Sequence, residues 1–168
     1  MPTYNAPVED MLFLYAKLRD NKNYQEIDKY KEVTTDLVKN ILEEAAKINQ
    51  NLILPLAKAG DENPTVLENG IVRTPPGYKE AYKKFIDDGW TSLSCDPKYG
   101  GQGMPRTVSA FFDEMISSSS LAFKLYSELT LGAYNCIHHH ATDEIKDCLL
   151  YTSPSPRDLS TSRMPSSA

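Results

Sequence analysis

The sequence predicts an all-α protein, a bundle of about six helices. Apolar residues recur at three- and four-residue spacing in most segments before residue 148, as they do on one face of an α-helix. No convincing run alternates apolar and polar side chains in the manner of a half-buried strand, and the sequence has no internal repeat. Hydrophobic residues make up 40% of the 168 residues, which is enough for a packed core.

The first two expected helices carry clear apolar stripes. The first runs from about Val8 to Asp20, with Pro7 at its start, where a missing N–H costs little. The second begins near Thr34, Thr35 or Asp36, and Pro55 should kink or end it, because the proline ring clashes with the carbonyl of Asn51. The stripe residues are Met11, Leu14, Tyr15 and Leu18 in the first helix and Leu37, Ile41, Ala45, Ile48 and Leu52 in the second.

A polar loop, GDENPTVLENGIVRTPPG, follows, with a short extended turn at residues 70–73. The third helix should begin between Pro76 and Tyr78 and stop at Gly89, a residue suited to a left-handed helix end. Residues 91–104 contain Pro97 and three glycines and should form a tight, non-helical connection.

The remaining expected helices follow closely on one another. The fourth runs from residue 105 or 106 to about 117, and residues 117–120 form a junction of four serines. The fifth covers roughly 120–140. The sixth starts at Thr142, with Asp143 and Glu144 in its first turn, where carboxylates favour the helix dipole.

Charge and composition exclude several classes of partner. The chain has 18 basic and 23 acidic residues, a net charge of −5, and no concentrated basic stripe for nucleic acid or an anionic membrane. No stretch is long and apolar enough to span a bilayer, and the start lacks the pattern of a secretory signal, so we expect a cytoplasmic location. The three cysteines have no paired spacing and should be reduced thiols.

The last 21 residues, CLLYTSPSPRDLSTSRMPSSA, differ sharply from the rest. They include six Ser, three Pro and two Thr, a composition that resists regular structure. This segment, 148–168, resembles translated sequencing-adaptor DNA, and we expect a non-native, disordered tail. The other interpretation is a natural Ser/Pro linker.

Several motifs have both a chemical and a structural interpretation. Tyr99-Gly100-Gly101-Gln102-Gly103 could bind phosphate, but it lacks the spacing and context of known phosphate loops, which favours a glycine turn. Residues 138–140 are consecutive histidines that point about 100° apart on a helix and cannot converge on one metal ion. The adjacent carboxylate pairs likewise point to different sides. No catalytic, cofactor-binding or metal-binding residue is therefore expected.

One helix face is a candidate ligand groove. Tyr126, Thr130, Ala133 and Ile137 are spaced by four, three and four residues. Small or polar members leave room that a core face would fill with larger side chains. Core packing is the other interpretation of this stripe.

Five stretches together resemble a known family. They are YNAPVEDMLFLY, NLILPLAKAGDEN, PPGYKEAYKKFIDDGW, CDPKYGGQGMP and SSSLAFKLYSELTLGAYNCIHHHATDEIK. In this order they resemble the helical N-terminal domain of the acyl-CoA dehydrogenases, in the branch that includes the 3-methylthiopropionyl-CoA dehydrogenases. The resemblance covers Pro2 to about Asp147. His140 matches the His of the family's turn before the next helix, whereas Ala141 replaces its Gly.

The resemblance implies a fragment of an enzyme. Residues 1–35 would be an N-terminal extension and 36–147 an incomplete N-terminal helical domain. In such enzymes FAD accepts a hydride from the β-carbon of an acyl-CoA after a carboxylate removes the α-proton. That base and most FAD contacts belong to other domains.

This region of the family forms one wall of the acyl pocket, which makes Tyr126, Thr130, Ala133 and Ile137 the expected substrate-binding residues. FAD, acyl-CoA, an electron-transfer acceptor and a homo-oligomeric assembly are expected of the parent, and this chain alone should be inactive. The alternative is a stand-alone helical binding or interaction module without catalysis.

Overall fold

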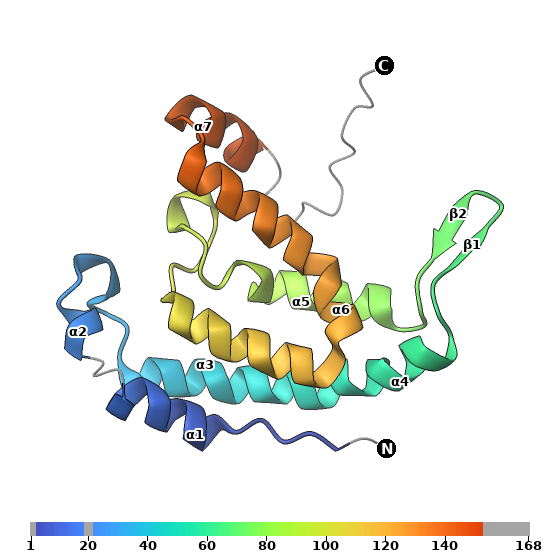
Figure 1. Ribbon diagram of the computed structural model, residues 1–168, viewed down its shortest axis with the longest axis horizontal. Coiled ribbons are helices and arrows are strands. Elements are labelled where there is room, and N and C mark those ends of the chain that lie inside the picture. The colour runs from blue at the N-terminus through green and yellow to red at the C-terminus, as the bar shows by residue number, and fades with distance from the viewer. Residues whose placement is uncertain (1–2, 19–21, 153–168) are drawn as a thin grey trace. The chain divides into compact units, whose positions relative to one another are not determined.

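The computed structural model describes residues 3–18 and 22–152, and Figure 1 shows their elements. The helices are α1 (Val8–Phe13), α2 (Lys22–Gln25), α3 (Thr35–Ile48), α4 (Leu54–Glu62), α5 (Tyr78–Asp87), α6 (Arg106–His140) and α7 (Asp143–Thr152). The strands are β1 (Val66–Glu68) and β2 (Ile71–Arg73). Short π-helical or 3-10 turns lie at Leu14–Leu18, Asp28–Tyr30, Asn49–Ile53, Trp90–Ser92 and Pro97–Tyr99. The prediction of an all-α protein is confirmed.

The described residues form two compact units. The first contains residues 3–18, 22–82 and 104–124, and the second contains residues 83–103 and 125–152. No helix in these described ranges is long and apolar enough to cross a membrane.

Helix α3 is the centre of the first unit and begins where the sequence predicted. The Thr34 hydroxyl caps it by accepting a hydrogen bond from the Leu37 backbone N–H, at 3.2 Å. Ala45 and Ile48 of the predicted stripe are buried, whereas Leu37 is 37% exposed and its neighbour Val38 is fully buried in its place. The buried face consists of Val38, Leu42, Ala45, Ala46, Ile48 and Asn49, and it continues to Ile53.

The predicted break before Pro55 takes the form of a wider helical turn. The chain passes from α3 through the π-helical turn at Asn49–Ile53 directly into α4, with Pro55 in the first turn of α4. In a π-helical turn the backbone is wider and lacks the usual i to i−4 hydrogen bond at the proline position. The Pro55 ring therefore avoids the carbonyl of Asn51. The helix therefore resumes after the proline.

The loop after α4 contains a hairpin that the sequence analysis anticipated only as a short extended turn. Strands β1 and β2 pair antiparallel, with Leu67 opposite Val72. The two connecting residues, Asn69 and Gly70, have φ angles of 51° and 76°. This geometry is that of a type I′ turn, for which Asn-Gly is the favoured sequence.

The expected helix boundaries further along are largely confirmed. Helix α5 ends before Gly89, which has the left-handed φ of 82°. Helix α6 is two helices joined at Ser120, whose φ and ψ of −161° and 97° are non-helical. The Ser120 hydroxyl accepts a bond from the Phe123 backbone N–H and so starts the second helix. The serine junction predicted at residues 117–120 is therefore present.

The second unit has its own small core. This core consists of the buried residues Cys95, Tyr99, Tyr134 and Leu150. The half-buried residues Leu131 and Ile137 pack against it. Since α7 runs to Thr152 and Leu150 is only 6% exposed, the predicted tail boundary at residue 148 is wrong for residues 148–152. Residues 153–168 lie outside the described residues, and the non-native origin of the tail stays a prediction.

Candidate functional site

The predicted ligand face lies on the second half of α6 and is not uniform. Tyr126 is 42% exposed and Ala133 is exposed, whereas Thr130 and Ile137 are half-buried. Ile137 packs against the core of the second unit. The four residues thus share one side of the helix, but Tyr126 and Ala133 are the members that meet solvent.

A neighbouring stripe on the same helix is more exposed and more apolar. Leu125 is 52% exposed and Leu129 is 81% exposed, and Gly132 and Cys136 are also exposed. Their spacing of four, three and four residues puts them on one face, next to Tyr126 and Ala133. Sequence reasoning missed this stripe although its periodicity is identical to that of the predicted one, because spacing identifies a face without showing which way it points.

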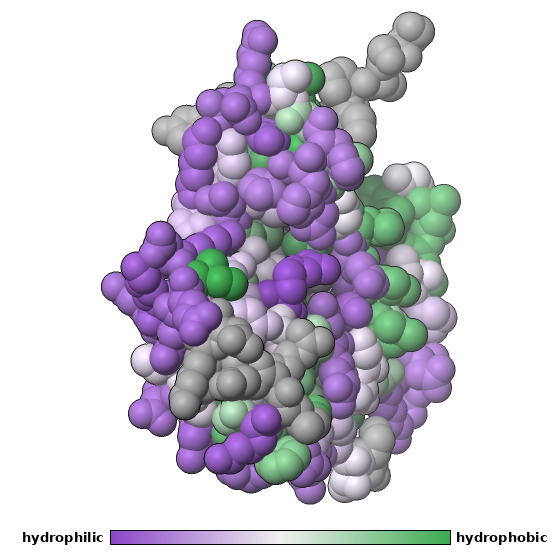
Figure 2. Space-filling view, turned by 60° about the vertical axis from the view of Figure 1, so that its left-hand side comes forward, coloured by the Kyte–Doolittle hydropathy of each residue, from purple (hydrophilic) through white to green (hydrophobic). Residues whose placement is uncertain are grey.

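Exposed apolar side chains also interrupt the surface elsewhere. On the face shown in Figure 2, hydrophobic residues gather most densely along the right-hand edge of an otherwise largely hydrophilic surface. The large hydrophobic residues that are more than half exposed are Phe13, Leu67, Ile71, Val72, Leu121, Leu125 and Leu129. A contiguous apolar surface normally marks a binding site or an interface, whereas singly exposed apolar residues are common on protein surfaces.

The glycine loop is a structural turn and holds its own backbone. Gly100 and Gly103 have φ angles of 82° and 67°, which a residue with a side chain rarely adopts. Its four consecutive backbone N–H groups donate to carbonyl oxygens at 2.9–3.1 Å: Gly100 to Pro97, Gly101 to Asp96, Gln102 to Ser92 and Gly103 to Cys95. A phosphate would need those N–H groups, so the loop is not a phosphate cradle.

Asp96 connects this loop to α6. Its backbone N–H donates to the Tyr134 hydroxyl at 2.8 Å, and its Oδ2 lies 3.4 Å from His138 Nε2. The His138 ring stacks on the Tyr134 ring, with centroids 5.3 Å apart and planes at 19°. Burial raises the pKa of Tyr134 to about 12, so its hydroxyl stays protonated and can serve as the acceptor.

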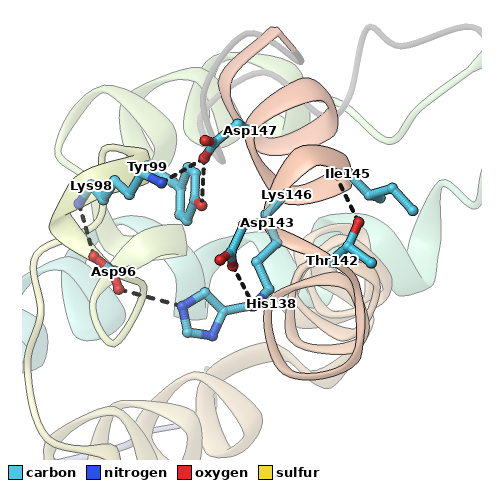
Figure 3. Close-up of polar contacts among 9 residues, drawn as sticks. All are labelled: Asp96, Lys98, Tyr99, His138, Thr142, Asp143, Ile145, Lys146 and Asp147. Atoms are coloured by element: carbon cyan, nitrogen blue, oxygen red, sulfur yellow. Dashed lines mark hydrogen bonds and ion pairs between the residues drawn. The ribbon is translucent and has the colours of Figure 1, made fainter.

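Two neighbouring loop residues connect to α7. Lys98 Nζ and the Tyr99 hydroxyl both donate to Asp147 Oδ1, at 2.6 and 2.9 Å (Figure 3). These two hydrogen bonds hold the pKa of Asp147 below its ordinary value. The same bond to Asp147 raises the pKa of Lys98. The cluster therefore fastens the loop to both helices, and its geometry is that of a tether.

The three histidines of residues 138–140 have structural surroundings. His138 is taken up by Asp96 and Tyr134, and within residues 3–18 and 22–152 no three His, Cys, Asp or Glu side chains are grouped as metal ligands. Cys95 is buried, Cys136 and Cys148 are exposed, and none of the three forms a disulfide within the described residues.

Two open grooves lie in the first unit. One, of about 510 Å³, is lined by Leu14, Arg106, Thr107, Ser109, Ala110, Phe111 and Asp113. The other, of about 600 Å³, is lined by Thr3, Tyr4, Asn5, Gln50, Leu54, Pro55, Lys58, Ala59 and Glu62. None of Tyr126, Thr130, Ala133 and Ile137 lines either groove.

Three curated proteins are similar to most of this chain. The 3-methylmercaptopropionyl-CoA dehydrogenase of Ruegeria pomeroyi is 37% identical over 144 residues, which cover 86% of this chain and 24% of that protein. The broad-specificity linear acyl-CoA dehydrogenase FadE5 of Mycobacterium tuberculosis is 25% identical over 149 residues, covering 87% of this chain and 24% of its own. The butyryl-CoA dehydrogenase of Syntrophomonas wolfei is 26% identical over 151 residues, covering 88% and 25%.

The chain therefore spans about a quarter of the length of the curated relatives that it matches. The family model described as "Acyl-CoA dehydrogenase, N-terminal domain" matches residues 35–152, which include α3 to α7 and the glycine loop. Because this match covers more than half of the sequence, the chain belongs to the acyl-CoA dehydrogenase family.

Proposed function

We propose that this chain is the N-terminal part of a flavin-dependent acyl-CoA dehydrogenase and that the second half of α6 forms one wall of its acyl pocket. The exposed apolar stripe on α6 carries the proposal. Leu129 is 81% exposed, and its neighbours Leu125, Gly132 and Ala133 leave a shallow, apolar surface beside it. An acyl chain, or the rest of the parent that encloses one, is suited to such a surface.

The glycine loop is not suited to the phosphates of FAD. The glycine loop has no N–H to offer, since Gly100, Gly101, Gln102 and Gly103 all donate within the loop region. In the parent, FAD would supply the acceptor for the hydride from the substrate. Its binding residues, like the base for the α-proton, would lie in the part of the parent outside this chain, which the length of the relatives accommodates.

The contribution of this chain would be shape and exclusion of water. Apolar side chains along α6 remove water from the acyl chain and hold it by burial, at roughly 25 cal/mol per Å² of apolar surface. The acyl-CoA substrate, an electron-transfer acceptor, a homo-oligomeric assembly and a cytoplasmic location are proposed for the parent. The length of the relatives favours this proposal over a stand-alone helical module.

The acyl-wall proposal is tested by Ala133→Phe in the full-length parent. We expect the larger side chain to raise KM for acyl-CoA at least several-fold while the free energy of unfolding changes by no more than about 0.5 kcal/mol, because Ala133 is exposed. Ala110→Phe is the matched control, an exposed alanine on the first half of α6. An unchanged KM with a large loss of stability would show that the Ala133 face is packed core.

The fragment proposal has a separate test. Purified chain that has been mixed with FAD and separated from free flavin by gel filtration should carry no flavin. It should also show no turnover with FAD, an acyl-CoA and an artificial electron acceptor, because the reacting groups must be held on one scaffold for turnover. A yellow, stoichiometric flavin complex or measurable turnover would overturn it. Sequencing the gene beyond codon 147 from an independent clone should reveal a further coding region, and a stop codon there would favour the stand-alone module.

A further inference from the structure

The β1–β2 hairpin exposes apolar side chains to solvent, although a hairpin of two strands is scarcely stable by itself. Both strands are exposed along their whole length, and Figure 1 shows the hairpin standing clear of α4. Leu67 is 71% exposed, Val72 63%, Ile71 59% and Val66 42%. An isolated two-stranded hairpin is at best marginally stable in water, and the apolar residues of this one face solvent, so their burial does not stabilise it. We therefore expect the hairpin to pack against another apolar protein surface.

The strand register separates the hairpin into two different faces. Leu67 pairs with Val72, so these two side chains share one face and form a wholly apolar surface. The opposite face holds the pairs Val66–Arg73 and Glu68–Ile71. There Arg73 Nε donates to Glu68 Oε2 at 2.8 Å, which closes that face with an exposed ion pair.

The chemistry of the Leu67–Val72 face favours a permanent partner. This face carries no charge that could attract a transient partner electrostatically. On the opposite face Arg73 and Glu68 form an ion pair with each other. Permanent interfaces are more apolar than transient ones and resemble the hydrophobic core of a domain. The hairpin also lies inside the family-matched range of 35–152, so it belongs to the domain proper.

The length of the relatives suggests which protein surface covers the Leu67–Val72 face. This chain covers 24% of the first two relatives, so three quarters of such a parent polypeptide lie outside the structure. We propose that the Leu67–Val72 face docks permanently onto an apolar surface of the parent's own polypeptide, outside the residues present here. This proposal rests on the proposed function only in requiring that the parent be a full-length member of the family.

Hydrogen exchange of residues 66–73 tests the docking. We expect these amides to exchange at least tenfold more slowly in the full-length parent than in this chain, because docking excludes water from the hairpin. The protection should not change with protein concentration, since the partner is part of the same polypeptide. Protection that grows with concentration in either protein would indicate a second copy as the occupant, and equal exchange rates in both proteins would mean that the hairpin is undocked; either result overturns the proposal.

Two adjacent substitutions separate the faces. In the parent, Val72→Lys should abolish the added protection, because it puts a charge into the apolar interface. Ile71→Lys is the matched control, since it has similar exposure on the opposite face and places its ammonium group beside Glu68; it should leave the protection intact. Equal loss in both variants would show a disrupted hairpin and refute docking through the Leu67–Val72 face.

Dehydrogenase activity of the same parent preparation distinguishes the two proposals. An inactive parent with a protected hairpin would contradict the proposed function and leave the docking standing. An active parent with an unprotected hairpin would contradict the docking alone.

Discussion

Replacing Gly101 with alanine should disrupt the glycine loop without any strain in the backbone dihedrals. A Cβ at this position would lie 2.2 Å from both the carbonyl carbon and the carbonyl oxygen of Cys95, and 2.5 Å from the Cys95 Cβ. Ordinary van der Waals contact begins near 3.4 Å. Two of the three atoms are main chain and cannot rotate away, so the loop itself must move.

The cost follows from what the loop holds in place. Overpacking a tight site costs typically 1–3 kcal/mol, occasionally more. Because Gly101 also donates to the Asp96 carbonyl, and Gly103 to that of Cys95, separating the two segments weakens these bonds as well. We expect a loss of at least about 2 kcal/mol, which is roughly 4–8 °C in Tm for a chain of this size.

Urea denaturation monitored by tryptophan fluorescence measures this loss. Trp90 is the single tryptophan of the sequence and lies in the turn just before the loop, so its emission reports on the second unit. Gly132→Ala is the matched control, because an added Cβ there meets nothing within 4 Å. In the interior of a helix that change should stabilise by about 0.5–1 kcal/mol.

The reasoning would be refuted if Gly101→Ala unfolded within about 0.5 kcal/mol of the wild type, since the clash would then be relieved at no cost. Destabilisation by Gly132→Ala of similar size would show that the loss is a general effect of replacing glycine.

Three further predictions concern the cluster that fastens the loop to α6 and α7. Tyr134→Phe leaves the Asp96 backbone N–H without its acceptor and should cost about 1–3 kcal/mol in urea denaturation; no change would mean that water replaces the hydroxyl. The pKa of Tyr134 is about 12 in the folded chain, above its ordinary 10.0, so it contributes stability that is complete below pH 10 and is lost as the pH rises through the folded value. A spectrophotometric titration of wild type against Tyr134→Phe should therefore show that this phenol ionises well above pH 10, whereas ionisation near pH 10 would contradict its burial. The pKa of Asp147 is lowered by Lys98 and Tyr99, so its stabilisation is present above its ordinary 3.8 and disappears as the pH falls through the lower folded value. The protection of the α7 amides, taken relative to their intrinsic exchange rates at each pH, should fall on that acidification in the wild type but be already low and less pH-dependent in Asp147→Asn, and identical profiles would exclude the tether.

Local chemistry made several features predictable from the sequence. The Thr34 cap, the left-handed stop at Gly89 and the serine junction at 117–120 depend on side-chain hydrogen bonds or φ preferences within a few residues. The preference for a glycine turn over a phosphate loop was also correct. It followed from the absence of a strand and of phosphate-loop spacing, both of which are visible in sequence.

Features that depend on distant residues were not predictable. The start of the α3 stripe was wrong, since Leu37 and Val38 are both apolar and only packing buries Val38, whereas Ala45 and Ile48 are buried as predicted. The helical continuation to Thr152 was missed because composition favoured a tail, whereas Leu150 is held by Cys95, Tyr99 and Tyr134. The cluster at Asp96 joins residues up to 49 positions apart and has no sequence signature.

The sequence by itself determined the helical class of this protein, the ends of most helices and its likeness to a family, because propensity, capping and residue order are properties of the chain. Tertiary structure alone decided which face of each helix meets solvent. On α6 two stripes have the same spacing. Ile137 of one stripe packs against the core of the second unit, whereas Leu125 and Leu129 of the other face water. Periodicity defines a direction only relative to the helix axis, whereas burial is set by what the rest of the chain places beside it.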